Sequence, residues 1–267
     1  MNIQKNFCLK DKNTFGVPAH AKFFVKVYSV EELKEFLKQF SGEKKLILGG
    51  GSNIVFTENF DGLVIMPQLL GKKIMESSNN SVIVESAAGE NWDEFVGWTV
   101  DQNFGGIENL SLIPGNVGTC PIQNIGAYGT EIKDVFKSLV AINIETGEEK
   151  TFTKKMCQFG YRDSVFKNEE KNKWVIASVK FVLQKNPTVN IAYGVIEKTL
   201  ESLDIKNPTI KDARNAIIKI RTEKLPDPKV IGNSGSFFKN PIVSVEKLEK
   251  IKKEYPNMPF YKISDTA

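Results

Sequence analysis

The chain has 267 residues, of which 41% are hydrophobic and 25% charged, and 36 basic against 32 acidic side chains give a formal net charge of +4. This balance is typical of a soluble globular protein long enough for two or three modest domains, and it excludes a disordered or collagen-like chain. The small charge and the scattered basic residues argue against a nucleic-acid-binding surface and allow at most a mild attraction for anionic small molecules.

The first part of the chain is predicted to form a β-α-β unit. A strand is expected over 22–27, and Ser29 is placed to cap a helix over 30–40, whose apolar residues recur at helical spacing. The segment 44–56 is typical of a buried strand that stops at three glycines and then resumes as a second extended run. A further short strand is predicted over 60–67.

Alternating apolar residues dominate beyond about residue 70 and predict a sheet. Thr146 and Gly147 occupy the expected turn of a hairpin. The segment 208–228 is predicted to begin as a helix and to end at the prolines Pro226 and Pro228, and a glycine-rich loop and another helix follow. The remaining predicted elements are strands over 81–89, 138–152 and 173–184 and a helix over 90–104. The predicted fold class is therefore α+β.

The cysteines and the single histidine exclude several kinds of chemistry. Cys8, Cys120 and Cys157 form no CxxC pair, so we expect no disulfide framework, no metal site and a reducing, cytoplasmic location. No signal-peptide core or run of membrane-spanning length occurs, so membrane insertion is not expected. With His20 alone, histidine-based triads and zinc sites are disfavoured, and a serine, arginine, lysine, tyrosine, carboxylate or cofactor must carry the chemistry.

Two glycine-rich stretches are candidates for binding a ligand. The sequence LILGGGSN ends a predicted strand and could present bare N–H groups to a phosphate, although it matches neither a Walker loop nor GxGxxG before a helix. The second stretch, 109–130, is apolar and holds Gly115, Gly118, Gly126 and Gly129. The alternative for both stretches is a set of buried tight turns. Together they could hold a cofactor that contains a pyrophosphate.

Two later motifs contain polar side chains suited to catalysis. In FGYRDSVFK (159–167), Arg162 either forms a surface pair with Asp163 or acts as a fixed cation for a carboxylate or an enolate. In the segment 221–241, Ser236 lies in a Gly-Asn-Ser-Gly-Ser loop among basic residues. It is either an ordinary loop serine or a proton donor to a strongly basic carbanion.

These motifs resemble one known family. NTFG, LILGGGSN, ENLSLIPGNVGTCPIQNIGAYG, FGYRDSVFK, KLPDPK and GNSGSFFKNP follow in the order and spacing of the UDP-N-acetylenolpyruvoylglucosamine reductases, from about residue 13 to residue 241. The segment 191–195 with Tyr193 resembles the longer type of that family.

The resemblance implies a two-part FAD-binding domain of the PCMH or vanillyl-alcohol-oxidase-like kind, with subdomains 1–68 and 69–214. Residues 215–267 would then begin an incomplete α+β substrate-binding domain. The resemblance places the following residues at the FAD: Gly49, Gly50, Gly51, Ser52, Asn53, Pro114, Gly115, Gly118, Thr119, Gln123, Asn124, Gly126, Ala127, Tyr128 and Gly129.

The implied reaction belongs to peptidoglycan precursor synthesis. NADPH reduces FAD and leaves, and the reduced flavin then converts UDP-N-acetylglucosamine enolpyruvate to UDP-N-acetylmuramate, so ping-pong kinetics are expected. Ser236 corresponds to the proton donor and Arg162 to the arginine that stabilises the enolate. The residues expected to contact the UDP-sugar are Tyr161, Tyr193, Lys224 and Asn240. A monomer is expected.

One departure from the family bears on activity. The family continues into a helix-rich stretch and a C-terminal strand with a catalytic glutamate, whereas this sequence stops at YKISDTA. We therefore expect FAD to bind but turnover to be poor. The alternatives are a related FAD-dependent oxidase or dehydrogenase for another small substrate, or a nucleotide-binding fragment with impaired catalysis. The lone His20 and the scattered cysteines argue against a covalently tethered flavin.

Overall fold

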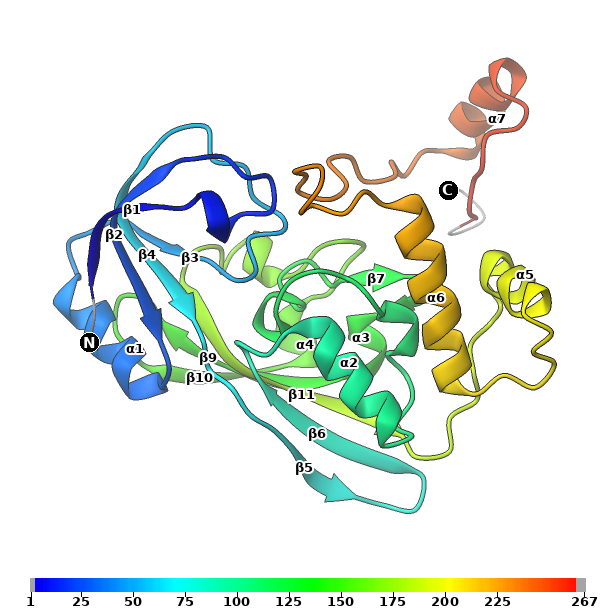
Figure 1. Cartoon of the computed structure of the whole chain (residues 1–267), viewed down its shortest axis with the longest axis horizontal. Helices are drawn as coiled ribbons and strands as arrows, with labels where there is room; N and C mark the ends of the chain where they lie inside the picture. Colours follow the sequence, from blue (N-terminus) through cyan, green and yellow to red (C-terminus); the bar gives the residue numbers. More distant parts are fainter. Residues whose placement is uncertain (1–2, 263–267) are drawn as a thin grey trace. The chain divides into compact units, whose positions relative to one another are not determined.

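The computed structural model describes residues 3–262 and divides into two units, Met1–Gly235 and Ser236–Ala267. The first unit contains two larger sheets, a two-stranded one and most of the helices (Figure 1). In the second unit, an exposed loop precedes the helix α7 (Val245–Glu254), which Ser244 caps by accepting a hydrogen bond from the Lys247 amide.

A four-stranded sheet forms the N-terminal part of the first unit. Its strands lie in the order β1 (Gln4–Cys8), β2 (His20–Val27), β4 (Phe60–Pro67), β3 (Lys45–Ile47). β2, β4 and β3 are parallel, whereas β1 is antiparallel to β2. Helix α1 (Val30–Gln39) connects β2 to β3, and Ser29 caps it as predicted. Its buried Leu33, Phe36 and Leu37 pack against the sheet. The first glycine-rich loop follows the end of β3.

The second sheet is antiparallel and has five strands. Their order is β10 (Glu149–Thr153), β9 (Phe136–Asn143), β11 (Trp174–Gln184), β6 (Ser81–Ala87), β5 (Lys72–Ser77). Helix α2 (Trp92–Asp101) begins at Asn91, which caps it, and packs on this sheet. Phe95 of α2 lies 5.2 Å from Phe181 of β11, measured between ring centroids. Figure 1 shows α2 on the same side of the sheet as the second glycine-rich stretch.

A long helix closes the first unit. α6 (Ile210–Lys224) begins with a capping box between Thr209 and Asp212 and ends before Leu225 and Pro226. It packs against α5 (Gly194–Ser202) through a separate small core. Short elements lie between the strands of the middle region: β7 (Gly126–Ala127), β8 (Thr130–Glu131), α3 (Ile132–Val135) and α4 (Lys154–Cys157).

The predicted α+β class is confirmed, and most predicted elements occur within a few residues of their expected bounds. The extended run expected after the three glycines is not part of a sheet, because 54–56 pairs with no neighbouring strand. The elements that were not predicted are β1, β5, β7, β8, α3, α4 and α5. The domain boundaries 1–68, 69–214 and 215–267 stay a prediction. Within residues 3–262, no helix is long and apolar enough to cross a membrane, and no cluster of acidic, histidine or cysteine side chains could hold a metal ion.

Candidate functional site

The first glycine-rich loop, Gly49–Asn53, is held by close contact with the N-terminal turn. Gly51 has a φ of +66°, and a Cβ built there would lie 2.0 Å from the Lys12 carbonyl oxygen. The Gly51 carbonyl oxygen accepts a hydrogen bond of 3.0 Å from the Thr14 amide. Only glycine fits this backbone position, both for its conformation and for its space.

The amide groups of this loop are suited to an anionic ligand. Within the described part of the chain, the N–H groups of Gly50, Gly51 and Ser52 donate to no backbone or side-chain acceptor. Successive unpartnered amides on a turn after a strand form a concave site for phosphate oxygens. The residues present therefore fit the pyrophosphate of a dinucleotide.

The second glycine-rich stretch lies directly against the first. A Cβ on Gly50 would lie 2.9 Å from the Gly115 Cα, and one on Gly49 would lie 2.6 Å from the Thr119 Cγ2. The Asn53 side-chain amide nitrogen, Nδ2, donates to the Gln123 side-chain oxygen at 3.0 Å, so a direct hydrogen bond joins the two stretches. The structure therefore brings together the two loops for which a shared cofactor was predicted, and it shows that these glycines allow protein segments to approach each other closely.

Asn124 links the second stretch to the motif that contains Arg162. It is fully buried, and its side-chain amide donates to the Gly160 carbonyl oxygen at 2.9 Å and to a Glu131 carboxylate oxygen at 3.2 Å. Its side-chain oxygen accepts from the Lys133 amide. These three bonds commit the side chain to internal contacts, so any contribution of Asn124 to FAD binding would come through its backbone.

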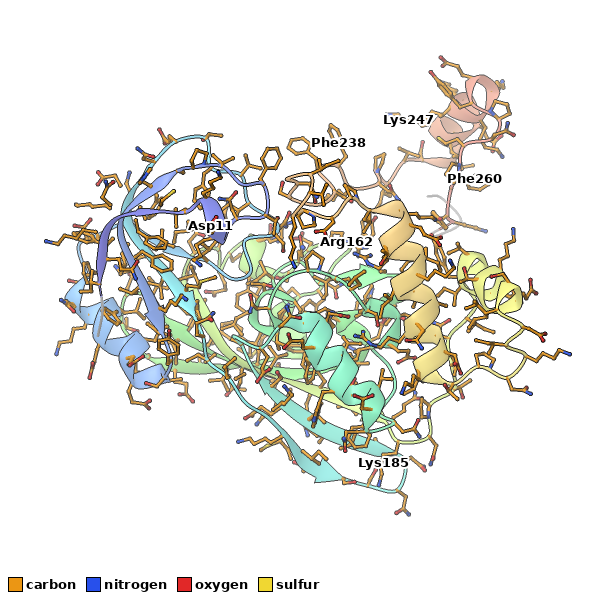
Figure 2. All side chains as sticks on the ribbon, viewed as in Figure 1. Asp11, Arg162, Lys185, Phe238, Lys247 and Phe260 are labelled. Atoms are coloured by element: carbon orange, nitrogen blue, oxygen red, sulfur yellow. The ribbon has the colours of Figure 1, made fainter. Side chains whose placement is uncertain are left out.

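Arg162 is fixed among the loops above the five-stranded sheet (Figure 2). Its backbone is left-handed, with φ at +53°, and its guanidinium donates to the Gly126 carbonyl oxygen and lies 3.4 Å from a Glu131 carboxylate oxygen. It also lies over the ring of Tyr161, at 5.2 Å. Asp163 instead accepts hydrogen bonds from the Ser164 amide and from Asn168, so the alternative of an Arg162–Asp163 surface pair is wrong.

Glu131 is a member of this site that the sequence reasoning missed. Its carboxylate contacts Arg162, Asn124 and Lys133, and its side chain is only 19% exposed. The available signal was its position: Glu131 is the first charged residue after the uncharged stretch 109–130, directly beside several predicted cofactor contacts.

A tyrosine pair connects the second stretch with a predicted substrate residue. The rings of Tyr128 and Tyr193 meet edge to face, with centroids 5.5 Å apart. Asn109 donates to the Tyr128 carbonyl oxygen at 3.1 Å. Arg221 of α6 lies near Tyr128: burial lowers the pKa of Arg221, and the interaction with Tyr128 offsets part of that effect. Lys224 is the last residue of the same helix.

Two predicted residues belong to the second unit. Ser236 and Asn240 are both exposed there, next to the exposed rings of Phe237 and Phe238. Their catalytic and substrate-binding roles stay predictions, as do those of the other predicted site residues.

Comparisons with known proteins show the cofactor and the fold. A family profile described as the FAD binding domain matches residues 21–153. A structure titled UDP-N-acetylenolpyruvylglucosamine reductase from Thermus caldophilus aligns over 95% of this chain and 80% of its own, with a TM-score of 0.64 and 22% identity. A solvent-stable cholesterol oxidase aligns over 69% of this chain with a TM-score of 0.51 and 14% identity, which shows a shared fold alone. The fold and the paired glycine loops thus define a flavoprotein that binds FAD.

Curated relatives give the particular family. The UDP-N-acetylenolpyruvoylglucosamine reductase of Flavobacterium johnsoniae is 58% identical over the whole chain, which covers 79% of that relative. The enzyme of the same name from Pseudomonas fluorescens is 43% identical over 99% of the chain and 78% of its own length. The chain belongs to the UDP-N-acetylenolpyruvoylglucosamine reductase family of FAD-dependent oxidoreductases, as the motifs in its sequence indicated.

Proposed function

We propose that this protein reduces UDP-N-acetylglucosamine enolpyruvate to UDP-N-acetylmuramate, with FAD as its cofactor and NADPH as the hydride donor. The observation that carries this proposal is the contact between the loops 49–53 and 114–129, which join beside Arg162. Membership of the reductase family supports the same substrate and the same cofactor.

The paired loops are proposed to bind the cofactor mainly through backbone. The amides of Gly50, Gly51 and Ser52 would donate to the pyrophosphate, because they have no acceptor among the described residues. The Asn53–Gln123 hydrogen bond would keep the two loops at a fixed distance. Bound FAD supplies the hydride chemistry of the reaction, and the protein supplies orientation and charge.

Arg162 is proposed to stabilise the negative charge that develops on the enolpyruvyl group. Its side chain is 30% exposed, and its contacts with Glu131 and the Gly126 carbonyl oxygen fix it before substrate arrives. A cation that is already oriented stabilises developing charge without the cost of reorganisation. The Ser236 hydroxyl would donate the proton to the neighbouring carbon, because a strongly basic carbanion can take a proton even from a weak acid.

The UDP-sugar is proposed to contact Tyr161, Tyr193, Lys224 and Asn240. The ring of Tyr161 lies beside Arg162, and the ring of Tyr193 lies against Tyr128 of the second glycine-rich stretch. The ammonium group of a lysine such as Lys224 is a compact positive charge, which is suited to binding the oxygens of a diphosphate. These contacts would place the enolpyruvyl group next to the cofactor loops.

The proposed role is in the synthesis of peptidoglycan precursors, and through it in cell shape and division. We place the protein in the cytoplasm as a monomer. The cysteine pattern supports a reducing compartment, because Cys8, Cys120 and Cys157 include no CxxC pair.

An anaerobic two-step titration tests this function. NADPH should bleach the long-wavelength absorbance of the bound flavin, and UDP-N-acetylglucosamine enolpyruvate should then restore it, with UDP-N-acetylmuramate detected by mass spectrometry. Bleaching without recovery on addition of the enolpyruvyl sugar would contradict the proposed substrate. UDP-N-acetylglucosamine without the enolpyruvyl group is the control that should not restore the absorbance.

A further inference from the structure

The segment that leads into Pro114 and Gly115 contains a residue in an unfavourable backbone conformation. Leu112 has a φ of +56°, a region that side chains other than glycine seldom adopt. Its amide donates to an Asp93 carboxylate oxygen at 2.6 Å, and its carbonyl oxygen accepts from the Arg221 Nε at 3.3 Å. Both main-chain polar groups of Leu112 are therefore held by side chains, one from α2 and one from α6.

A two-point ion pair fixes Asp93 in turn. The two guanidinium nitrogens of Arg214 lie 2.7 and 3.1 Å from the two carboxylate oxygens of Asp93, and one of them also donates to the Ser111 hydroxyl at 2.8 Å. Both side chains are mostly buried, with 15% of Arg214 and 27% of Asp93 exposed. Paired charges with two parallel hydrogen bonds define the geometry more strictly than a single contact does.

The charge state of Asp93 agrees with this arrangement. Burial by itself raises the pKa of the carboxyl, but hydrogen bonds from Arg214 and from the Leu112 amide outweigh it, so the pKa lies below its ordinary value. Gly97 follows one turn later in α2, and a Cβ there would lie only 3.3 Å from an Arg214 guanidinium nitrogen. The glycine leaves room for the arginine to reach Asp93.

Helix α6 contacts the second glycine-rich stretch at two places. Arg214 and Arg221 lie seven residues apart, so they project from the same face of the helix. Arg214 acts on Leu112 through Asp93, whereas Arg221 donates directly to the Leu112 carbonyl oxygen. The same helix ends at Lys224, within one turn of Arg221.

We propose that Asp93, Arg214 and Arg221 are positioning residues that hold the backbone of 112–115 in the conformation that receives FAD. They need not touch the cofactor themselves. The inference rests on the proposed function, because it assumes that FAD lies against Pro114 and Gly115. It also makes α6 a rigid link between the cofactor loop and Lys224, which is proposed to contact the substrate.

The test compares FAD binding by variants of the full 267-residue chain. Asp93→Ala removes the acceptor for the Leu112 amide and the partner of Arg214, whereas Asp93→Asn keeps an acceptor oxygen and removes only the charge. Glu94→Gln is the matched control, because Glu94 is the exposed neighbouring carboxylate in the same helical turn. FAD affinity is measured by quenching of flavin fluorescence, and the visible flavin band and the midpoint potential are recorded for each holoprotein.

Asp93→Ala should weaken FAD binding about tenfold and shift the visible flavin band, because a charged hydrogen bond that fixes the loop is lost. Asp93→Asn should show a smaller effect in the same direction, and Glu94→Gln should match the wild type. If Asp93→Ala fails to fold, Asp93→Asn and Arg221→Met decide the question in its place.

Two results would overturn the inference in distinguishable ways. In the first, Asp93→Ala and Arg221→Met show the FAD affinity, flavin band position and midpoint potential of the wild type and differ only in a lower melting temperature. These residues would then be purely structural, and the proposed function would still stand. Failure of the wild-type chain to bind FAD would overturn the proposed function and this inference with it.

Discussion

Replacement of Gly51 by alanine tests whether the first loop needs a bare backbone. At a φ of +66°, alanine costs about 1–2 kcal/mol because its Cβ crowds the following carbonyl oxygen. The new Cβ would also lie 2.0 Å from the Lys12 carbonyl oxygen and 2.9 Å from the Asn13 Cα. These are backbone atoms, so the loop has to move, and overpacking of this kind costs a further 1–3 kcal/mol, roughly. The total expected loss is about 2–5 kcal/mol.

A second glycine separates the two contributions. Gly147, in the turn between β9 and β10, has a φ of +73°, and its nearest neighbouring atom would lie 3.9 Å from a new Cβ. Gly147→Ala should therefore cost only the conformational part, about 1–2 kcal/mol. Urea unfolding of both variants gives the difference, and fluorescence titration should show FAD bound at least tenfold more weakly by Gly51→Ala alone. Equal stability losses and equal FAD affinities in the two variants would refute the reasoning.

Three further predictions concern Arg162, Glu131 and the cysteines. Arg162→Lys keeps the charge but loses the planar guanidinium that reaches both Gly126 and Glu131. In stopped-flow experiments, reoxidation of the reduced flavin by the enolpyruvyl sugar should therefore slow about a hundredfold, while reduction of the flavin by NADPH is unchanged. Glu131→Gln should slow the same step about tenfold, because Arg162 loses its ion-pair partner; an equal slowing of NADPH reduction would contradict both predictions. Burial raises the pKa of the Cys157 thiol from 9.0 to about 12. The contribution of the protonated thiol to folding stability is therefore fully present below pH 9 and is lost as the pH rises towards 12. At pH 8, a thiol reagent should label the exposed Cys8 alone until the protein unfolds.

The cofactor loops could be predicted from sequence because local residue types determine them. Three consecutive glycines after a strand require a turn with close neighbours, and the second glycine-rich stretch has the same property. The structure adds which segments approach: Gly50 meets Gly115, and Asn53 reaches Gln123. The sequence predicted a shared ligand, but it could not show that the glycines also serve contacts between the loops themselves.

The partners of the charged residues could not be predicted, because tertiary structure selects them. Arg162 has an acidic neighbour in sequence, yet its left-handed backbone directs the guanidinium to Glu131, 31 residues earlier. Asp93 and Arg214 are 121 residues apart. No local pattern marks such pairs.

The missed strand β1 has a physical explanation of a different kind. Four of its five residues are exposed, and it lies at the edge of its sheet, so it lacks the alternating apolar pattern from which strands are recognised. Its pairing with β2, from Gln4 opposite Phe24 to Cys8 opposite His20, is determined by backbone hydrogen bonds that the residue types do not reveal.

The most direct test of this account is an FAD titration of the purified chain. The purified protein is expected to be yellow, to bind one FAD per chain and to release the flavin intact on acid precipitation. The Gly50→Ala variant is expected to bind FAD at least tenfold more weakly, because the new Cβ pushes the loop away from Gly115. A colourless protein that does not bind added FAD would contradict the central claim that these two loops form a flavin site.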